Sequence, residues 1–299
     1  MAAEEPNNFR SESTARGRLL RGEASIGSIL VHEGRLTREN AERIVKLQRE
    51  QGLRFGDAAL QLGLLTAADI DFALSCQFDH SYLMHGESTV SESVVTAYAP
   101  NSPQAQAISA LRTQLMLGWY DNDDPKKSLA IISAERGEGR SYITANLAVA
   151  FSQLGLKTLL IDSDMRNPRQ HILFGLDNRR GLSAMLSGRG GSEPLIQPID
   201  GLFNLSVLTT GALPPNPLEL LARPLFPQLL DELMQEYEII LLDSPPSSEY
   251  PDAQTIAVRA AATLIVAKKN ASRAWKVRGV SKAINHASAT VIGTVLNDF

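Results

Sequence analysis

Residues 128–141 have the sequence SLAIISAERGEGRS, and this stretch decides the fold of most of the chain. An apolar run (128–133) leads into a glycine-rich turn, and the helical pattern that follows ends at Gly155. A strand, a glycine-rich turn and a helix in this order are what a phosphate-binding loop requires. Gly137 and Gly139 lack Cβ atoms, so backbone N–H groups can converge on phosphate oxygens at the positive end of the helix.

Short apolar runs alternate with helical patterns from residue 128 onward. Helices are expected at 217–236 and 273–288, after an earlier one at 104–120. The further strands are expected within 157–164, 202–211, 237–245, 262–269 and 289–297. Apolar strands joined by helical crossovers predict an α/β fold with a parallel sheet covered on both faces.

Three aspartates stand at the carboxyl ends of expected strands. Asp162 and Asp164 follow one strand, and Asp243 ends another in the position of a Walker B carboxylate. In a parallel sheet that edge lies over the phosphate loop, where Ser141 offers a hydroxyl for Mg²⁺. Any one of these aspartates alone is better explained as a helix cap or a turn residue, but all three together predict a site for Mg²⁺ and a catalytic base.

Composition limits the class of protein. The 299 residues suffice for two domains, and the longest apolar runs are too short to span a bilayer. The single cysteine fits a reducing compartment, and a net charge of −4 gives no footprint for nucleic acid. We therefore expect a cytoplasmic protein with no membrane span of its own and no nucleic-acid partner.

An internal repeat precedes the α/β region. Residues 25–48 align with 54–77 at a constant offset of 29. Each copy predicts a short helix, a glycine turn, a threonine N-cap and a second helix. The expected organisation is a disordered tail (1–21), a small all-α helical repeat module (22–85), a polar linker (86–103) and an α/β domain (104–299).

The α/β region resembles the bacterial tyrosine kinases of exopolysaccharide synthesis. The resemblance rests on IISAERGEGRS, LLIDSDMRNPRQH, NPLELL, YEIILLDSPP with a following DA, and VIGTVLND. These kinases share a P-loop NTPase fold, with a variant Walker A loop, with septum-site and plasmid-partition ATPases. The resemblance implies ATP and Mg²⁺ as cofactors, phosphoryl transfer to tyrosine, and an inner-membrane chain-length-determining partner that holds the protein peripherally at the membrane.

The resemblance also implies roles for individual residues. Asp162, Asp164 and Arg140 would be catalytic, with Asp162 as the candidate base. The metal ligands would be Ser141, Asp162 and Asp243. The nucleotide would be bound by Arg136, Gly137, Glu138, Gly139, Arg140, Ser141, Tyr142 and Asn297. Arg136 is either a second cation facing the phosphates or a solvated side chain, and we favour the latter.

Departures from the family pattern leave a second hypothesis open. Arg140 replaces the loop lysine, and a planar guanidinium does not substitute simply for an ammonium group. No tyrosine follows Tyr250, whereas these kinases usually end in a tyrosine-rich tail. Only Arg112 matches the family's oligomerisation motif, so the question of a homo-oligomer stays open. The alternatives are a non-catalytic nucleotide-binding regulator and, less favoured because Glu135 replaces a signature lysine, a partition-type ATPase.

The repeat module has a resemblance of its own, to the front module of type II secretion and pilus-assembly ATPases. The second copy carries RFGD, Gly63 and Gln77 of the motifs that can bind cyclic di-GMP in that module. In the first copy Ser25 stands where arginine is usual, and a dianionic ligand needs such contacts. Simple protein docking is therefore favoured over binding of cyclic di-GMP.

Overall fold

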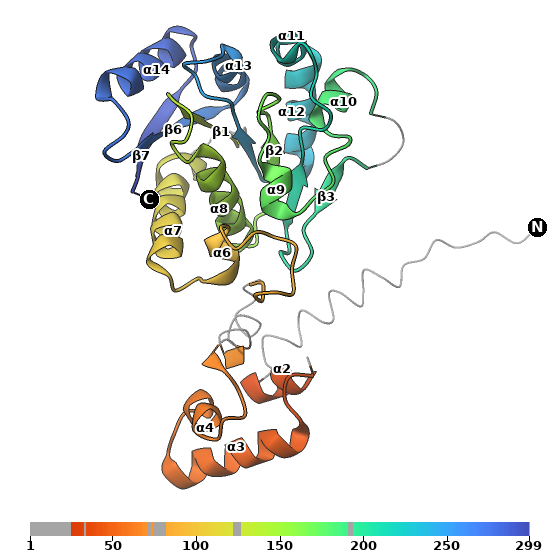
Figure 1. The fold of residues 1–299 in the computed structure, drawn as a ribbon, viewed down its shortest axis with the longest axis vertical. Helices are drawn as coiled ribbons and strands as arrows, with labels where there is room; N and C mark the ends of the chain where they lie inside the picture. Colours follow the sequence, from red (N-terminus) through yellow and green to blue (C-terminus); the bar gives the residue numbers. More distant parts are fainter. Residues whose placement is uncertain are drawn as a thin grey trace, which may run out of the picture. The chain divides into compact units, whose positions relative to one another are not determined.

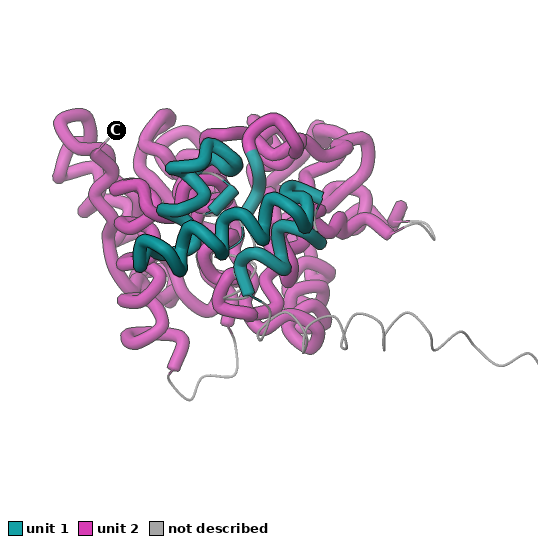
Figure 2. Tube along the Cα trace, turned by 90° about the horizontal axis from the view of Figure 1, so that it is seen from below, with its two compact units in different colours: residues 1–84 teal, residues 85–299 magenta. Residues whose placement is uncertain are grey.

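The chain forms two compact units, Met1–Met84 and His85–Phe299 (Figure 2). The computed structural model describes residues 25–32, 34–67, 69–70, 73, 82–121, 127–190 and 194–298. The expected disordered tail (1–21) and Gln77 of the second repeat lie outside the described residues.

The first unit is helical, as the repeat predicts. Its described helices are α2 (Ile26–His32), α3 (Arg38–Gln51) and α4 (Phe55–Gln61). The Thr37 hydroxyl caps α3 by accepting from Asn40 N. Thr66 and Asp69 form a reciprocal capping box: Asp69 N donates to the Thr66 hydroxyl (3.2 Å), and Thr66 N donates to the Asp69 carboxylate (2.9 Å). Both predicted caps are confirmed.

A seven-stranded sheet forms the centre of the second unit (Figure 1). Its strands are β1 (Ser128–Ser133), β2 (Thr158–Asp162), β3 (Ile196–Pro198), β4 (Leu205–Leu208), β5 (Ile239–Asp243), β6 (Ala262–Lys268) and β7 (Val291–Asn297). The order is β3-β4-β2-β5-β1-β6-β7, and only the β3–β4 pairing is antiparallel. The carboxyl ends of β1, β2 and β5 therefore meet at the centre of one edge.

Helices cover the sheet on both faces (Figure 1). They are α6 (Val95–Tyr98), α7 (Pro103–Leu115), the π-helical turn η1 (Met116–Tyr120), α8 (Arg140–Ser152), α9 (Gln170–Phe174), α10 (Leu182–Leu186), α11 (Pro217–Ala222), α12 (Leu225–Glu236), α13 (Asp252–Arg259) and α14 (Ala274–His286). One core cluster joins Ala130, Ile132 and Ile240 to α11–α14. Helix α8 lies against β1, β2, β4 and β5 and is almost wholly buried. The predicted doubly covered parallel sheet is confirmed, apart from the antiparallel edge strand β3.

Three expectations need correction. The helix expected at 217–236 is two helices, α11 and α12, because Arg223 before Pro224 takes an extended conformation. The helix expected at 104–120 changes to a π-helical turn after Leu115. Residues 86–103 are not a free linker: Thr96 is buried and donates its N–H to the Asn146 side chain on α8 (3.0 Å).

Candidate active site

The loop between β1 and α8 has the backbone that a phosphate cradle needs. Gly137 and Gly139 have φ angles of 81° and 94°, in the left-handed region that favours glycine. Helix α8 begins directly after Gly139. The N–H groups of its first turn have no acceptor within the helix, so they are available to a phosphate held by the loop. A Cβ atom at Gly139 would overlap the Asn297 amide nitrogen, whereas one at Gly137 would meet nothing within 4 Å.

Side chains around the loop hold it in this shape. Glu138 is 3% exposed; its carboxylate accepts from Glu135 N (2.7 Å) and from the Ser272 hydroxyl. Asn297, at the end of β7, donates its amide to the Glu138 carbonyl oxygen (3.1 Å), and Lys276 pairs with Glu135. Glu138 and Asn297 were predicted to bind nucleotide. Here Asn297 bonds to the loop backbone, and Glu138 bonds to the loop backbone and to Ser272, so their binding of nucleotide stays a prediction.

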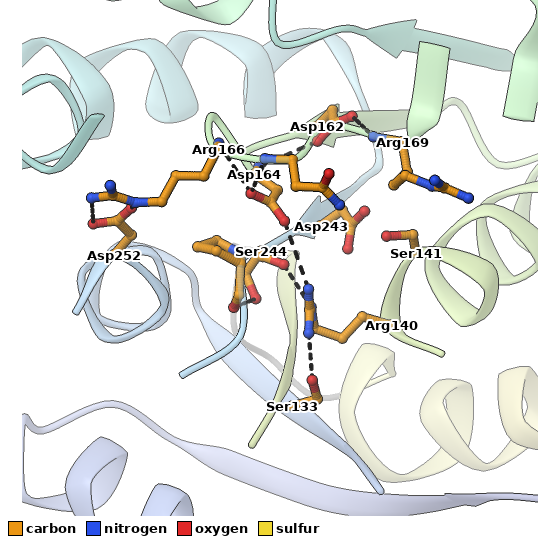
Figure 3. Close-up of polar contacts among 12 residues, drawn as sticks. Ser133, Arg140, Ser141, Asp162, Asp164, Arg166, Arg169, Asp243, Ser244 and Asp252 are labelled. Atoms are coloured by element: carbon orange, nitrogen blue, oxygen red, sulfur yellow. Dashed lines mark hydrogen bonds and ion pairs between the residues drawn. The ribbon is translucent and has the colours of Figure 1, made fainter. Parts of the chain in front are cut away.

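Arg140 turns its guanidinium away from solvent. Its Nε donates to the Ser244 carbonyl oxygen (2.6 Å), and its terminal nitrogens reach the Ser133 hydroxyl and, at 3.7 Å, the Asp164 carboxylate (Figure 3). The residue is 7% exposed. These partners lie at the ends of β1, β2 and β5, so Arg140 ties three strand ends together.

Asp162 and Asp164 both accept hydrogen bonds from nearby backbone. Asp162 caps the start of α9 by accepting from Arg169 N and Gln170 N, both at 2.9 Å. Asp164 accepts from Arg166 N (3.1 Å) and Asn167 N (2.9 Å). Asp162 is therefore a helix cap and Asp164 is a turn residue, and both still lie at the predicted edge. Their catalytic roles stay predictions.

Asp243 has a carboxylate oxygen that could still accept a hydrogen bond or bind a cation. It is fully buried in register with Asp162 on the neighbouring strand. Its Oδ2 accepts from the Gln170 amide (2.8 Å), while its Oδ1 has no hydrogen-bond partner in the described part of the chain. A buried charged oxygen without a partner is costly, which points to a ligand absent from the protein chain.

Burial sets the pKa values of this pair. It raises the pKa of Asp162 to about 8, with the charge of Asp243 adding to the effect and the N–H groups of Gln170 and Arg169 opposing it. Burial also raises the pKa of Asp243, against the positive charge of Arg140, the neighbouring Ser141 hydroxyl and the hydrogen bond from the Gln170 amide. Two adjacent buried carboxylates thus favour a cation between or beside them.

The residues present fit Mg²⁺ with a nucleotide. Mg²⁺ in nucleotide sites takes one or two protein oxygens and completes its shell with phosphate and water. The Ser141 hydroxyl and the free Asp243 oxygen supply such a pair. Among the described residues, no three His, Cys, Asp or Glu side chains form a group that could hold a metal ion.

Two predicted nucleotide ligands lie at the rim. Arg136 is exposed at the tip of the loop, as expected for a solvated side chain. Tyr142 is half-buried in the first turn of α8, and burial raises the pKa of its hydroxyl. Neither arrangement tests binding of nucleotide.

Sequence reasoning missed Gln170. Its amide bridges the Ser141 carbonyl oxygen (3.2 Å) and Asp243, joining α8, α9 and β5. It also missed Ser133 and Ser244, the two residues to which Arg140 donates hydrogen bonds. Gln170 and Ser244 do fall within the stretches that carry the family resemblance, and Ser133 ends the first strand, but no pattern in the sequence reveals which side chains they contact.

Similar proteins place the chain in a family. A family model for the ParA group, described as NUBPL iron-transfer P-loop NTPase, matches residues 124–298. CapB of Staphylococcus aureus, which carries a tyrosine-protein kinase name, is 37% identical over 201 residues, covering 66% of this chain and 86% of CapB. The tyrosine-protein kinase YwqD of Bacillus subtilis is 32% identical over 210 residues, covering 70% of this chain and 87% of YwqD. The chain belongs to the bacterial tyrosine kinases.

A solved structure agrees with this membership. The kinase domain of the Escherichia coli tyrosine kinase ETK superposes with a TM-score of 0.66 at 29% identity, covering 69% of this chain and 79% of that chain. The predicted kinase family and its P-loop NTPase fold are thereby confirmed. The match spans only 27% of the full-length Escherichia coli relative. The resemblance of the first unit to secretion-ATPase modules stays a prediction.

No described helix of this bacterial tyrosine kinase is both long and apolar enough to cross a membrane.

Proposed function

We propose that the chain is an ATP- and Mg²⁺-dependent protein-tyrosine kinase that regulates chain length and export in exopolysaccharide synthesis. The observation that carries the proposal is the free, buried Oδ1 of Asp243 at the edge where Ser141 opens α8. Family membership supports the reaction class, since relatives are named tyrosine-protein kinases.

Each site residue then has a defined task. The N–H groups at Gly137, Gly139 and the start of α8 would bind the phosphates. Ser141 and Asp243 would hold Mg²⁺, Asp243 through water, with Asp162 as the third predicted ligand. The ion would neutralise charge on the transferred phosphoryl group.

Asp162 is the proposed base for the acceptor hydroxyl. A pKa of about 8 makes its carboxylate, once ionised, a stronger proton acceptor than an ordinary aspartate. Asp164 would assist by holding Arg140, to which it lies at 3.7 Å. Arg140 would leave Ser133 and Ser244 to meet the developing charge at the γ-phosphate.

A second candidate is a regulator that binds nucleotide without transferring phosphate. Its support is the side chain of Arg140, which already has the Ser244 carbonyl, the Ser133 hydroxyl and Asp164 as partners. Moving it to a phosphate would break these contacts. Phosphoryl transfer depends mainly on charges positioned around the phosphates. If Arg140 keeps its present contacts, transfer of the phosphoryl group would be slow, while ATP could still bind.

The partner and location complete the proposal. We infer a membrane-bound chain-length determinant as partner, which would hold this chain at the cytoplasmic side of the inner membrane. Cyclic di-GMP at the first unit stays a secondary prediction, and calorimetry with the isolated dinucleotide tests it.

Phosphotyrosine formation distinguishes the two candidates. The chain is incubated with labelled ATP, Mg²⁺ and its partner, alongside Asp243→Asn, Asp162→Ala and Arg140→Lys, with exposed Asp200→Asn as matched control. A kinase labels tyrosine in wild type and Asp200→Asn and loses the label in the first two variants. Label in Arg140→Lys alone, with normal ATP binding by wild type, would establish the second candidate instead.

A further inference from the structure

The C-terminal part of the second unit is strongly basic. Residues 253–297 contain seven Lys or Arg residues and no Asp or Glu, although the whole chain has a net charge of −4. The seven are Arg259, Lys268, Lys269, Arg273, Lys276, Arg278 and Lys282. A block of charge of one sign attracts an anionic partner where its side chains face solvent without acidic neighbours.

Two of these cations are already paired, whereas others are free. Lys276 pairs with Glu135 of the phosphate loop, and Lys269 pairs with Asp298 at 2.6 Å. Arg278 and Lys282 are exposed and form no ion pair within the described part of the chain. Both of these free cations lie on α14.

Helix α14 has one buried and one open face. Ile284 is buried in the core cluster, and the helix packs against β6, β7 and α13 at the outside of the second unit (Figure 1). Trp275 is 65% exposed, and Arg278 and Lys282 follow it at helical spacings of three and four residues, so the three side chains share the open face. A Cβ atom at Gly279, one turn after Trp275, would meet nothing within 4 Å. The described residues therefore leave this face uncovered.

A tryptophan beside free cations is suited to the surface of an anionic lipid bilayer. The indole has an apolar body and a polar N–H, and tryptophan is enriched where lipid headgroups meet acyl chains. Lys and Arg side chains on a helix at a membrane surface attract acidic phospholipid headgroups. The charge thus selects an anionic surface, and the indole favours one that it can enter.

We propose that the open face of α14, formed by Trp275, Arg278 and Lys282, binds an anionic phospholipid surface directly, with Trp275 inserted among the headgroups. This contact is additional to the proposed membrane partner and does not depend on phosphoryl transfer. The start of α14 also touches the phosphate loop, through the Lys276–Glu135 pair and the bond from Ser272 to Glu138. Binding of lipid by α14 would therefore bring the nucleotide edge of the sheet close to the membrane.

Cosedimentation with vesicles and tryptophan fluorescence test this on the full chain. The vesicles contain phosphatidylglycerol and phosphatidylcholine in equal parts, or phosphatidylcholine alone. The chain has two tryptophans, and the other, Trp119, is only 4% exposed, so a blue shift of the emission on binding reports Trp275. We expect binding and a blue shift with phosphatidylglycerol only, and we expect added salt to weaken both because it screens the charges.

A matched pair of double variants locates the contact. Each Lys or Arg near an anionic surface strengthens binding about fivefold, so Arg278→Gln with Lys282→Gln should weaken it roughly 25-fold. Arg179→Gln with Arg189→Gln removes the same charge from exposed positions before β3, at the opposite end of the sheet, and should bind as wild type does. All four side chains are exposed, so the free energy of unfolding is expected to be unchanged.

Three outcomes would overturn the proposal. Equal weakening in the two double variants would show attraction by overall charge rather than by α14. Binding to vesicles without a blue shift would place the contact elsewhere in the chain. Binding to a DNA duplex, with none to vesicles, would make nucleic acid the partner of this face.

Discussion

Gly139 is the residue at which the phosphate loop has least freedom. Its φ of 94° is unfavourable for any side chain, and the Asn297 amide fills the space where a Cβ atom would stand. Gly137 has a similar φ of 81° but open space around it. Substituting each glycine in turn therefore distinguishes the cost of backbone strain, common to both positions, from the cost of steric overlap, present only at Gly139.

We expect Gly139→Ala to weaken nucleotide binding and stability more than Gly137→Ala. Left-handed backbone costs a non-glycine residue roughly 1–2 kcal/mol, which both variants share. Gly139→Ala must in addition displace Asn297 from Glu138. Urea unfolding and binding of a fluorescent ATP analogue measure the difference, and equal losses in the two variants would contradict the steric argument.

Gln170 is expected to set the pH at which the proposed metal site binds its ion. Its amide lowers the pKa of Asp243, so Gln170→Leu raises that pKa further and keeps the carboxylate protonated to higher pH. Manganese binding, followed by electron paramagnetic resonance, should then reach half-saturation at higher pH than in wild type. Exposed Asp200→Asn is the control and should leave the profile unchanged.

The positions of these residues were predictable, but their contacts were not. The alternation of apolar runs places Asp162, Asp164 and Asp243 at one edge, because parallel strands must end together there. Nothing local in the sequence says that Arg140 bonds to Ser244, 104 residues away. Such a contact depends on the packing of three strand ends, which periodicity does not encode.

At the scale of elements, the segment expected to be a linker shows the same limit. Its Ser, Thr and Pro content is typical of a loop, yet the side-chain oxygen of Asn146 on α8 accepts from the N–H and from the hydroxyl of Thr96, both at 3.0 Å. The Asn146 amide also donates to the Ser93 carbonyl oxygen (3.2 Å). Polar residues that are satisfied by a distant helix cannot be told from solvated ones by composition.

Asn146→Ala should release this segment from α8. The change leaves the buried Thr96 N–H without its acceptor, and each such loss costs about 1–3 kcal/mol. Hydrogen exchange at Thr96 should quicken, and the free energy of unfolding should fall by that amount. Exposed Asn285→Ala is the control. Unchanged exchange at Thr96 would show that other contacts hold the segment.

At the scale of the whole molecule, the buried carboxylates shape stability against pH. In the native state Asp162 holds its proton up to a pKa of about 8, whereas in the unfolded chain it releases it near 3.8. Between these values the native state binds more protons than the unfolded state. Stability from this group is therefore fully present below the lower value and lost as pH rises through the upper one.

Asp162→Asn should flatten that dependence. In the metal- and nucleotide-free protein, we expect the free energy of unfolding to fall between pH 5 and pH 8 in wild type more steeply than in the variant. Urea titrations at a series of pH values measure the slope, and Asp200→Asn should match wild type. An identical slope in Asp162→Asn would show that another group governs it.

The hydrogen bonds that fix the segment after residue 85 to α8 and α9 have a mechanical consequence. Ser91 N donates to the Leu173 carbonyl oxygen of α9 (2.7 Å), and Thr96 N donates to the Asn146 side chain of α8 (3.0 Å). A pull on the chain at residue 85 would therefore load α8 and α9 first. These two helices carry Ser141, a proposed Mg²⁺ ligand, and Gln170, which bonds to Asp243, so tension applied at residue 85 would be delivered to both side chains.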